Sequence, residues 1–141
     1  MKAADLMTTP PVTVDVGATA FDAAQRMARE AVGCVLVTLD GRLCGILTDR
    51  DLALRGLALG HGPWQPVADL MTTAVTTVDT DDDLDSAYRT FRVSGVRRIP
   101  VLDHGRPVGM LTVDDLLRDV VQRLFDLLVP VSADALPETA V

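Results

Sequence analysis

Aromatic residues are scarce in this chain of 141 residues, which holds three Phe, one Tyr and one Trp. The interior must therefore be built from Val, Leu, Ile, Ala and Met, and the hydrophobic fraction of 48% is sufficient for a packed core. The length allows one compact domain or two small intertwined ones.

Basic residues are too few for a nucleic-acid binder. Asp and Glu number 20 against 13 Lys and Arg, which gives a net charge of −7. A non-specific nucleic-acid binder needs a basic surface to neutralise phosphates, so we expect no nucleic-acid partner. Any phosphate site in this chain must be made by a local cluster of donors.

Long apolar runs are also missing. No run approaches the 18 or so apolar residues that a membrane-spanning helix needs. The start of the chain, Met1–Asp5, lacks the apolar region of a secretion signal. We therefore expect no membrane partner and a cytoplasmic location.

Cysteine and histidine are too few and too scattered for a metal site. Cys34 and Cys44 flank a predicted hairpin. A two-residue turn between them places Val37 opposite Cys44, and Cys34 three residues further along its strand, out of disulfide reach. Both are interpreted as small buried apolar residues. His61 and His104 are isolated, so we expect no metal.

What the sequence does have is an internal repeat. When the chain is shifted by 64 positions without a gap, Ala4–Leu52 lies over Ala68–Leu116 with 19 of 49 residues identical. One copy alone would bury too little apolar surface to be comfortably stable, so we expect two copies that share one cooperative core. Clefts between related halves are natural places for ligands.

The hydrophobic and turn patterns predict the same order of elements, β-α-β-β-α, in each copy. Three short strands per copy are expected, at 12–14, 34–39, 42–47, 76–78, 98–102 and 107–111. Thr19, with Asp22 three residues on, predicts a capped helix start. The Asp81-Asp82-Asp83 run suits a helix N-terminus better than a metal. We predict an α/β fold of two intertwined repeats, each with a small three-stranded sheet, related by a pseudo-twofold axis.

The expected boundaries follow from the repeat and from the Gly and Pro residues. The first motif should span 1–59, a Gly- and Pro-rich linker 60–66, and the second motif 67–129. Pro130 is expected to end the last helix, which leaves 130–141 as a flexible C-terminal tail.

The last helix, at about 114–128, carries an amphipathic stripe that is too apolar to stay in contact with water. Two interpretations stay open, an interface between two copies in a homodimer and burial against the chain's own first helices. The residues assigned to the dimer interface are Leu117, Val121, Leu124, Phe125 and Leu128.

A Gly-x-x-Thr-x-x-Asp motif closes each copy. Thr48 and Thr112 lie where a strand meets a helix, where a hydroxyl and the first free N–H groups can bind a phosphate. Asp51 and Asp115 lie one turn further, and an ionised carboxylate can accept both hydroxyls of a ribose. Thr-x-x-Asp at a helix start is equally a capping box that needs no ligand.

The sequence resembles a tandem pair of cystathionine-beta-synthase-type (CBS) domains, a stand-alone Bateman module, over roughly residues 1–128. The resemblance rests on the tandem copy, Asp-Leu-Met-Thr at the head of each copy, the hairpin start Ile99-Pro100-Val101, and the Gly-x-x-Thr-x-x-Asp motifs at 45–51 and 109–115. It implies two interlocked β-α-β-β-α motifs, adenine-nucleotide binding in the clefts between them, and dimers that form flat discs.

The resemblance also implies which residues line the clefts. Cationic side chains at the start of the second strand can contact nucleotide phosphates, and the head of the opposite copy adds a Thr. One cleft is then expected to combine Asp115, Thr112, Arg97 and Arg98 with Thr8 or Thr9. The other is expected to combine Asp51, Thr48, Gly33 and Cys34 with Thr72 or Thr73.

We expect the two clefts to be unequal. Guanidinium groups bind phosphate through paired donors, so the cleft of Arg97 and Arg98 should be favoured for a phosphorylated ligand. The alternative for these two arginines is a surface or dimer-contact pair.

The predicted function is a regulatory module that binds AMP, ADP, ATP or S-adenosylmethionine and signals through its dimer or an effector protein, with no required cofactor. The alternative is a dimerisation or interaction module without a ligand, in which the Thr-x-x-Asp motifs are only helix caps. An enzyme is not expected, because the chain has no Walker A, Gly-x-Ser-x-Gly or His-Glu-x-x-His sequence and no clustered Cys and His.

Overall fold

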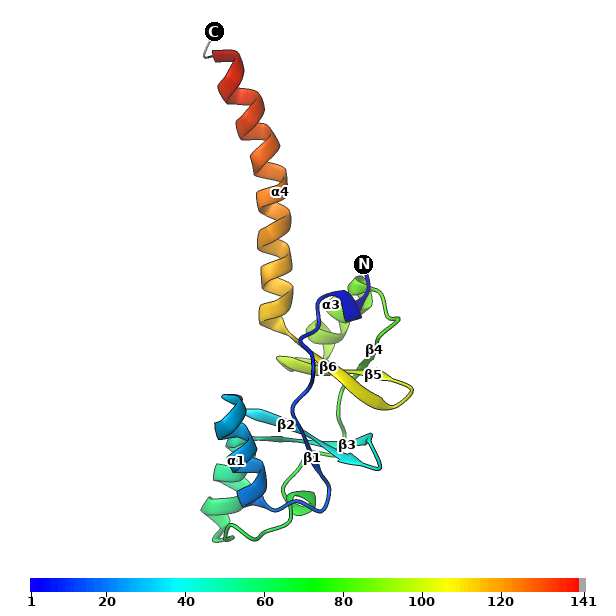
Figure 1. The fold of residues 1–141 in the computed structure, drawn as a ribbon, viewed down its shortest axis with the longest axis vertical. Coiled ribbons are helices and arrows are strands. Elements are labelled where there is room, and N and C mark those ends of the chain that lie inside the picture. Colours follow the sequence, from blue (N-terminus) through cyan, green and yellow to red (C-terminus); the bar gives the residue numbers. More distant parts are fainter. Residues whose placement is uncertain (140–141) are drawn as a thin grey trace.

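The computed structural model describes the backbone of residues 1–139 and the side chains of residues 1–129. It contains two three-stranded sheets, ordered β1-β2-β3 and β4-β5-β6, and the predicted β-α-β-β-α order in each repeat (Figure 1). The first repeat consists of β1 (Thr13–Asp15), α1 (Ala20–Glu30), β2 (Cys34–Leu39), β3 (Arg42–Thr48) and α2 (Asp49–Asp51). The second consists of β4 (Val78–Asp79), α3 (Leu84–Ser94), β5 (Arg98–Asp103), β6 (Arg106–Thr112) and α4 (Val113–Thr139). Short helical turns are η1 (Ala3–Asp5), the π-helical η2 (Leu52–Gly56), η3 (Leu57–Leu59) and η4 (Val67–Asp69).

Both predicted helix starts are capped by side chains. The Thr19 Oγ1 accepts the Asp22 N–H at 3.2 Å, and Asp22 Oδ2 accepts the Thr19 N–H at 3.0 Å, which confirms the capping box before α1. Asp83 caps α3 by accepting the Ser86 N–H at 2.7 Å. The hydrogen bonds with Ser86 lower the pKa of Asp83, since they favour its ionised form.

Each hairpin contains a β-bulge that the sequence pattern did not predict. Val37 lies opposite Gly45, and Cys44 is the extra residue, so the expected pairing of Val37 with Cys44 is wrong. The same register shift recurs in the second hairpin, where Val101 lies opposite Gly109. Cys34 and Cys44 are both free thiols; Cys34 is buried as predicted, whereas Cys44 is only half-buried.

The two repeats exchange their first residues. The first head segment, residues 1–8, packs in the core of the second repeat, where Ala3 joins Val78, Ile99 and Leu111. In Figure 1 the N-terminus lies beside α3, and the chain then descends to β1 in the other half of the molecule. The second head segment, residues 66–72, completes the core of the first repeat in the same way, with contributions from Val67, Leu70 and Met71.

Backbone hydrogen bonds fix both exchanged segments. The Ala3 N–H donates to the Asp82 carbonyl at 2.8 Å, and Thr8 forms an antiparallel bridge with Met110 on β6. The second head segment mirrors this, because Thr72 bridges Ile46 on β3. Neither repeat therefore has a complete core or complete backbone pairing without residues from the other.

The glycine of each Gly-x-x-Thr-x-x-Asp motif lies beneath a methionine of the opposite head segment. A Cβ atom placed on Gly109 would lie 2.8 Å from Met7 Cγ and 3.0 Å from the Thr8 carbonyl oxygen. A Cβ on Gly45 would lie 2.9 Å from Met71 Cγ. Glycine is needed at both positions because the exchanged segment approaches the strand this closely.

Helix α4 extends beyond the body of the molecule (Figure 1). It continues to Thr139, so the prediction that Pro130 ends the helix is wrong. A proline inside a helix removes one backbone hydrogen bond and costs about 3 kcal/mol. The residues beyond it include strong helix formers such as Ala133, Ala135 and Leu136, which favour continuation.

The apolar stripe of α4 does not pack against the chain's own helices. Leu116 is buried at the base of the helix, but the five stripe residues are 49–58% exposed: Leu117, Val121, Leu124, Phe125 and Leu128. Of the two interpretations that the sequence left open, burial against the first helices is therefore wrong.

Replacing Gly109 by Val should lower the free energy of unfolding by about 1–3 kcal/mol, because overpacking against Met7 and the Thr8 carbonyl forces the exchanged segment to move. The measurement is urea denaturation at equilibrium. The matched control is Gly62→Val, since a Cβ at Gly62 meets no atom within 4 Å. Equal stability of the Gly109 and Gly62 variants would contradict the role assigned to the close contact.

Candidate functional site

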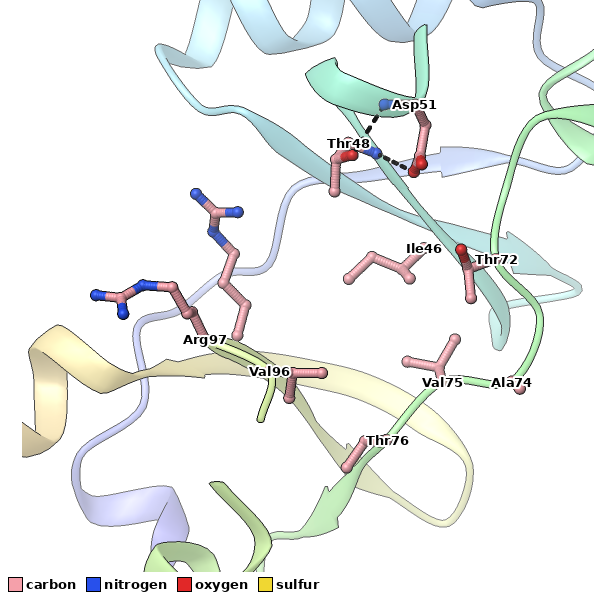
Figure 2. A pocket seen from close by; sticks show the side chains of 10 residues that line it. Ile46, Thr48, Asp51, Thr72, Ala74, Val75, Thr76, Val96 and Arg97 are labelled. Atoms are coloured by element: carbon pink, nitrogen blue, oxygen red, sulfur yellow. Dashed lines mark hydrogen bonds between the residues drawn. The ribbon is translucent and has the colours of Figure 1, made fainter. Parts of the chain in front are cut away.

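A cavity of about 410 Å³ lies between the repeats (Figure 2). The first repeat contributes the end of β3 and the start of α2, and the second contributes residues 72–76 and 96–98. The volume is that of a small-molecule site. Its lining residues are Ile46, Thr48, Asp51, Thr72, Ala74, Val75, Thr76, Val96, Arg97 and Arg98.

Asp51 presents one unused carboxylate oxygen at this cavity. Its Oδ2 accepts the Thr48 N–H at 2.9 Å, and Thr48 Oγ1 accepts the Asp51 N–H at 3.1 Å, so the motif forms the capping box expected from the sequence. Within the described residues Oδ1 accepts no hydrogen bond, and its nearest cationic partner is Arg55 Nε at 3.9 Å. The side chain is 18% exposed. Oδ1 is therefore free to accept a hydroxyl donor from a ligand.

Asp115, the equivalent acid of the second repeat, has no comparable freedom. It forms the same capping box with Thr112, at 2.9 and 3.1 Å. Its Oδ1 also accepts a hydrogen bond from Arg118 Nη1 at 3.2 Å, and the side chain is only 6% exposed. Neither Thr112 nor Asp115 lines the cavity.

The two predicted phosphate-binding arginines share a cavity with the acid of the first repeat, and not with the acid of the second repeat as expected. Arg97 and Arg98 share the cavity with Asp51, so their predicted grouping with Thr112 and Asp115 is wrong. The prediction took the start of one strand and the end of the next from the same repeat. In the structure the cavity lies between repeats, and each repeat supplies only one of these two walls (Figure 2).

The backbone bridges of the two head segments decide which of their threonines line the cavity. Thr72 lines the cavity with Thr48, as predicted, because it pairs with Ile46 on β3. Thr8 pairs with Met110 on the side of Thr112 and does not line the cavity. Thr9 and Thr73 are exposed and also lie outside it.

The sequence interpretation missed the apolar part of the lining. Ile46 could have been found, because it lies two residues before Thr48 on one strand and therefore on the same face. Nothing in the sequence pattern indicated Val75 or Val96, which come from irregular segments. In Figure 2, Asp51 and Thr48 lie on one side of the cavity and Val96 and Arg97 on the other, with Ile46 between them.

Cys34, which was predicted to line the cleft of Asp51 and Thr48, is buried and has an unreactive thiol. Burial raises the pKa of its thiol from 9.0 to about 11, Arg98 acts in the opposite direction, and the nearby Asp51 adds to the rise. The thiol is therefore protonated at neutral pH and is not a nucleophile.

A family model for the CBS domain matches residues 3–56 and again residues 67–122. The chain belongs to the CBS domain family. Its two repeats are a pair of CBS domains, and the architecture implied by the sequence resemblance is confirmed.

Relatives of this CBS pair cover most of its length. The CBS domain-containing protein YhcV of Bacillus subtilis is 36% identical over 112 residues, which are 79% of this chain and 80% of YhcV. The crystal structure of Hypoxic Response Protein I with two coordinated zinc ions matches with a TM-score of 0.76 and 32% sequence identity. The match covers 84% of this chain and 98% of that one. CBSX2 in complex with AMP is 28% identical with a TM-score of 0.73, over 86% and 96% of the two chains.

Two further classes of feature are absent from the part of this CBS pair that the structure describes. No group of three or more His, Cys, Asp or Glu side chains in that part is placed to hold a metal ion. None of its helices combines the length and apolar character that a membrane span requires.

In the folded CBS pair Cys34 should be alkylated at least tenfold more slowly than in the unfolded chain at pH 8, because a pKa of about 11 leaves roughly one thiol in a thousand ionised. Iodoacetamide labelling with peptide mass spectrometry measures both rates. Between pH 9 and 11 the folded chain keeps a proton that the unfolded chain releases, so stability should fall as pH rises through this range. Equal labelling rates with and without urea would contradict the burial of the thiol.

Proposed function

We propose that this CBS pair is a regulatory module that binds one adenine nucleotide or related adenosyl ligand in the cavity between its repeats. The observation that carries the proposal is that one cavity is lined by a carboxylate, by arginines and by apolar side chains. Asp51, with its open oxygen, and two exposed arginines, Arg97 and Arg98, line the same space, together with an apolar surface. The AMP complex of the related CBSX2 supports this ligand class.

Each part of an adenine nucleotide has a suitable partner in the cavity. Asp51 Oδ1 accepts ribose hydroxyls, since an ionised carboxylate has several acceptor positions. Arg97 and Arg98 pair with the phosphate through their N–H donors. The apolar side chains of Ile46 and Val75 contact the base. AMP, ADP and ATP fit this scheme best, and S-adenosylmethionine would use the ribose and base contacts alone.

The binding stoichiometry that follows is one ligand per chain. Asp115 already pairs with Arg118, and the position equivalent to Arg97 and Arg98 in the first repeat holds Gly33 and Cys34. A ligand at the second motif would have to displace Arg118 and would find no guanidinium at that position.

Regulation follows because the opposite walls of the cavity belong to different repeats. Because the two repeats supply opposite sides of the cavity, a bound ligand stabilises the relative arrangement in which both sides contact it. The output then passes to a second copy of the chain or to an effector protein. Catalysis is not part of this proposal, since the Thr48 hydroxyl and Asp51 Oδ2 are both engaged in the capping box.

One observation favours the alternative of a module without a ligand. Both Thr-x-x-Asp motifs form complete capping boxes, so each already has a structural role. A cap that uses only Oδ2 leaves Oδ1 available, however, and the two roles are compatible at Asp51.

The exposed stripe of α4 is the surface that we assign to homodimerisation. Leu117, Val121, Leu124 and Leu128 follow a four-three-four spacing, which is the seam of two packed helices. All four are about half exposed, and no charged residue interrupts the seam. Association of two copies would remove this apolar surface from water.

Replacing Asp51 by Asn should weaken AMP binding by about 10- to 100-fold, because a charge-assisted hydrogen bond contributes about 1.5–3 kcal/mol. Thr48 still caps α2, and the asparagine carbonyl oxygen can accept the Thr48 N–H as Oδ2 does now, so the fold is kept. Isothermal titration calorimetry with AMP, ADP, ATP and S-adenosylmethionine measures affinity and stoichiometry. The matched control is Asp115→Asn, which should bind as the wild type does. Unchanged affinity of the Asp51 variant, or a wild-type chain that binds none of the four, would contradict the proposal.

Replacing Leu124 by Glu should convert the homodimer to monomer, since a carboxylate in the centre of the stripe would have to be desolvated. Size-exclusion chromatography with multi-angle light scattering gives the mass. Gln122→Glu adds the same carboxylate at an exposed position outside the stripe and should leave the dimer intact, although it removes the hydrogen bond that Gln122 donates to Asp126 at 3.0 Å. An intact dimer of the Leu124 variant would rule out this interface.

A further inference from the structure

Arg55 connects the two repeats beside the cavity without lining it. It belongs to η2, the π-helical turn that follows Asp51. Its Nη1 donates to the carbonyl oxygens of Leu70 at 3.3 Å and Met71 at 3.4 Å, and its Nε lies 3.9 Å from Asp51 Oδ1. One guanidinium of the first repeat thus contacts the open oxygen of Asp51 and the second head segment.

The contacted carbonyls are next to the cavity wall. Leu70 and Met71 immediately precede Thr72, which lines the cavity and exchanges two hydrogen bonds of 2.9 Å with Ile46. The wall continues through residues 74–76. Arg55 fixes the backbone just before Thr72 and can therefore influence the position of one wall. Through its contact with Asp51 it can influence the other wall.

Within the described residues, no arginine of the second repeat joins Asp115 to the first head segment; Arg123 of α4 reaches Met1 Sδ at 3.7 Å, but it pairs with Asp119. The residue 64 positions after Arg55 is Asp119, in the regular helix α4. The arginine that pairs with Asp115 is Arg118, which lies one turn along in the same helix. Among the described hydrogen bonds Arg118 has none to the first head segment. The π-helical turn and its arginine thus distinguish the repeat whose acid faces the cavity.

The strength of these contacts sets the size of the expected effect. Arg55 is 52% exposed, so its ion pair with Asp51 is screened by water and contributes little by itself. The two carbonyl contacts are at the long end of hydrogen bonds. The planar guanidinium, however, holds its donors in a fixed fork, so one side chain can orient both partners at once.

We propose that Arg55 is a positioning residue that holds Asp51 Oδ1 and the Leu70–Thr72 backbone in the arrangement that accepts a ribose diol. This inference rests on the proposed function, because it names how the binding acid is placed. Arg55 acts through Asp51 and Thr72 and does not contact the ligand itself.

Calorimetric titration of Arg55→Met, Arg55→Lys and wild type with AMP and with its 2′,3′-dideoxy analogue tests this role. AMP binding should weaken about three- to tenfold in Arg55→Met, and Arg55→Lys should recover part of it by restoring a cationic donor. The dideoxy analogue, which has no ribose hydroxyl for Asp51, should bind Arg55→Met and wild type alike. Arg118→Met is the matched control, and its AMP affinity should equal that of the wild type.

Two results would overturn the inference. Equal losses for AMP and the dideoxy analogue would mean that Arg55 only shapes the cavity, and an unchanged AMP affinity would mean that it does not position Asp51. If AMP binding depends on Asp51 but not on Arg55, this inference alone fails. If AMP binding does not depend on Asp51, the proposed function fails and the inference with it.

Discussion

The reciprocal exchange of head segments is the constraint on which the rest of the structure depends. Each repeat is too small to bury a sufficient core by itself, and each receives its missing apolar residues from the other. The exchange also explains a sequence feature that ligand chemistry alone would not. Gly45 and Gly109 lie beneath Met71 and Met7, so the glycines of the repeated motif serve the packing of the two halves.

The same exchange creates the candidate site. Because the second head segment crosses onto β3, Thr72 lines the same cavity as Thr48 and Asp51, and the following residues form a wall that faces the first repeat. The two repeats differ in the surroundings of the acid that ends each Thr-x-x-Asp motif. Asp51 keeps one open oxygen, whereas Asp115 is closed by Arg118. In the described residues, two related repeats thus present one open acid and one closed acid.

The fold could be predicted from the sequence because its signals are local and occur twice. Turn glycines and capping residues such as Thr19 act on residues close to them in the sequence. The repeat recurs at one offset of 64 residues. The assignment of Arg97 to its cavity depended instead on how the repeats face each other, which no local pattern encodes. The bulge at Cys44 and the continuation of α4 past Pro130 were missed for a related reason, since register and helix length depend on the balance of neighbouring contacts.

A crystal structure of the chain grown with AMP tests the central claim most directly. The account predicts one nucleotide per chain between the repeats, with its ribose hydroxyls on Asp51 Oδ1, its phosphate beside Arg97 and Arg98, and both head segments exchanged. A nucleotide bound instead at Thr112 and Asp115, or head segments packed within their own repeats, would contradict it.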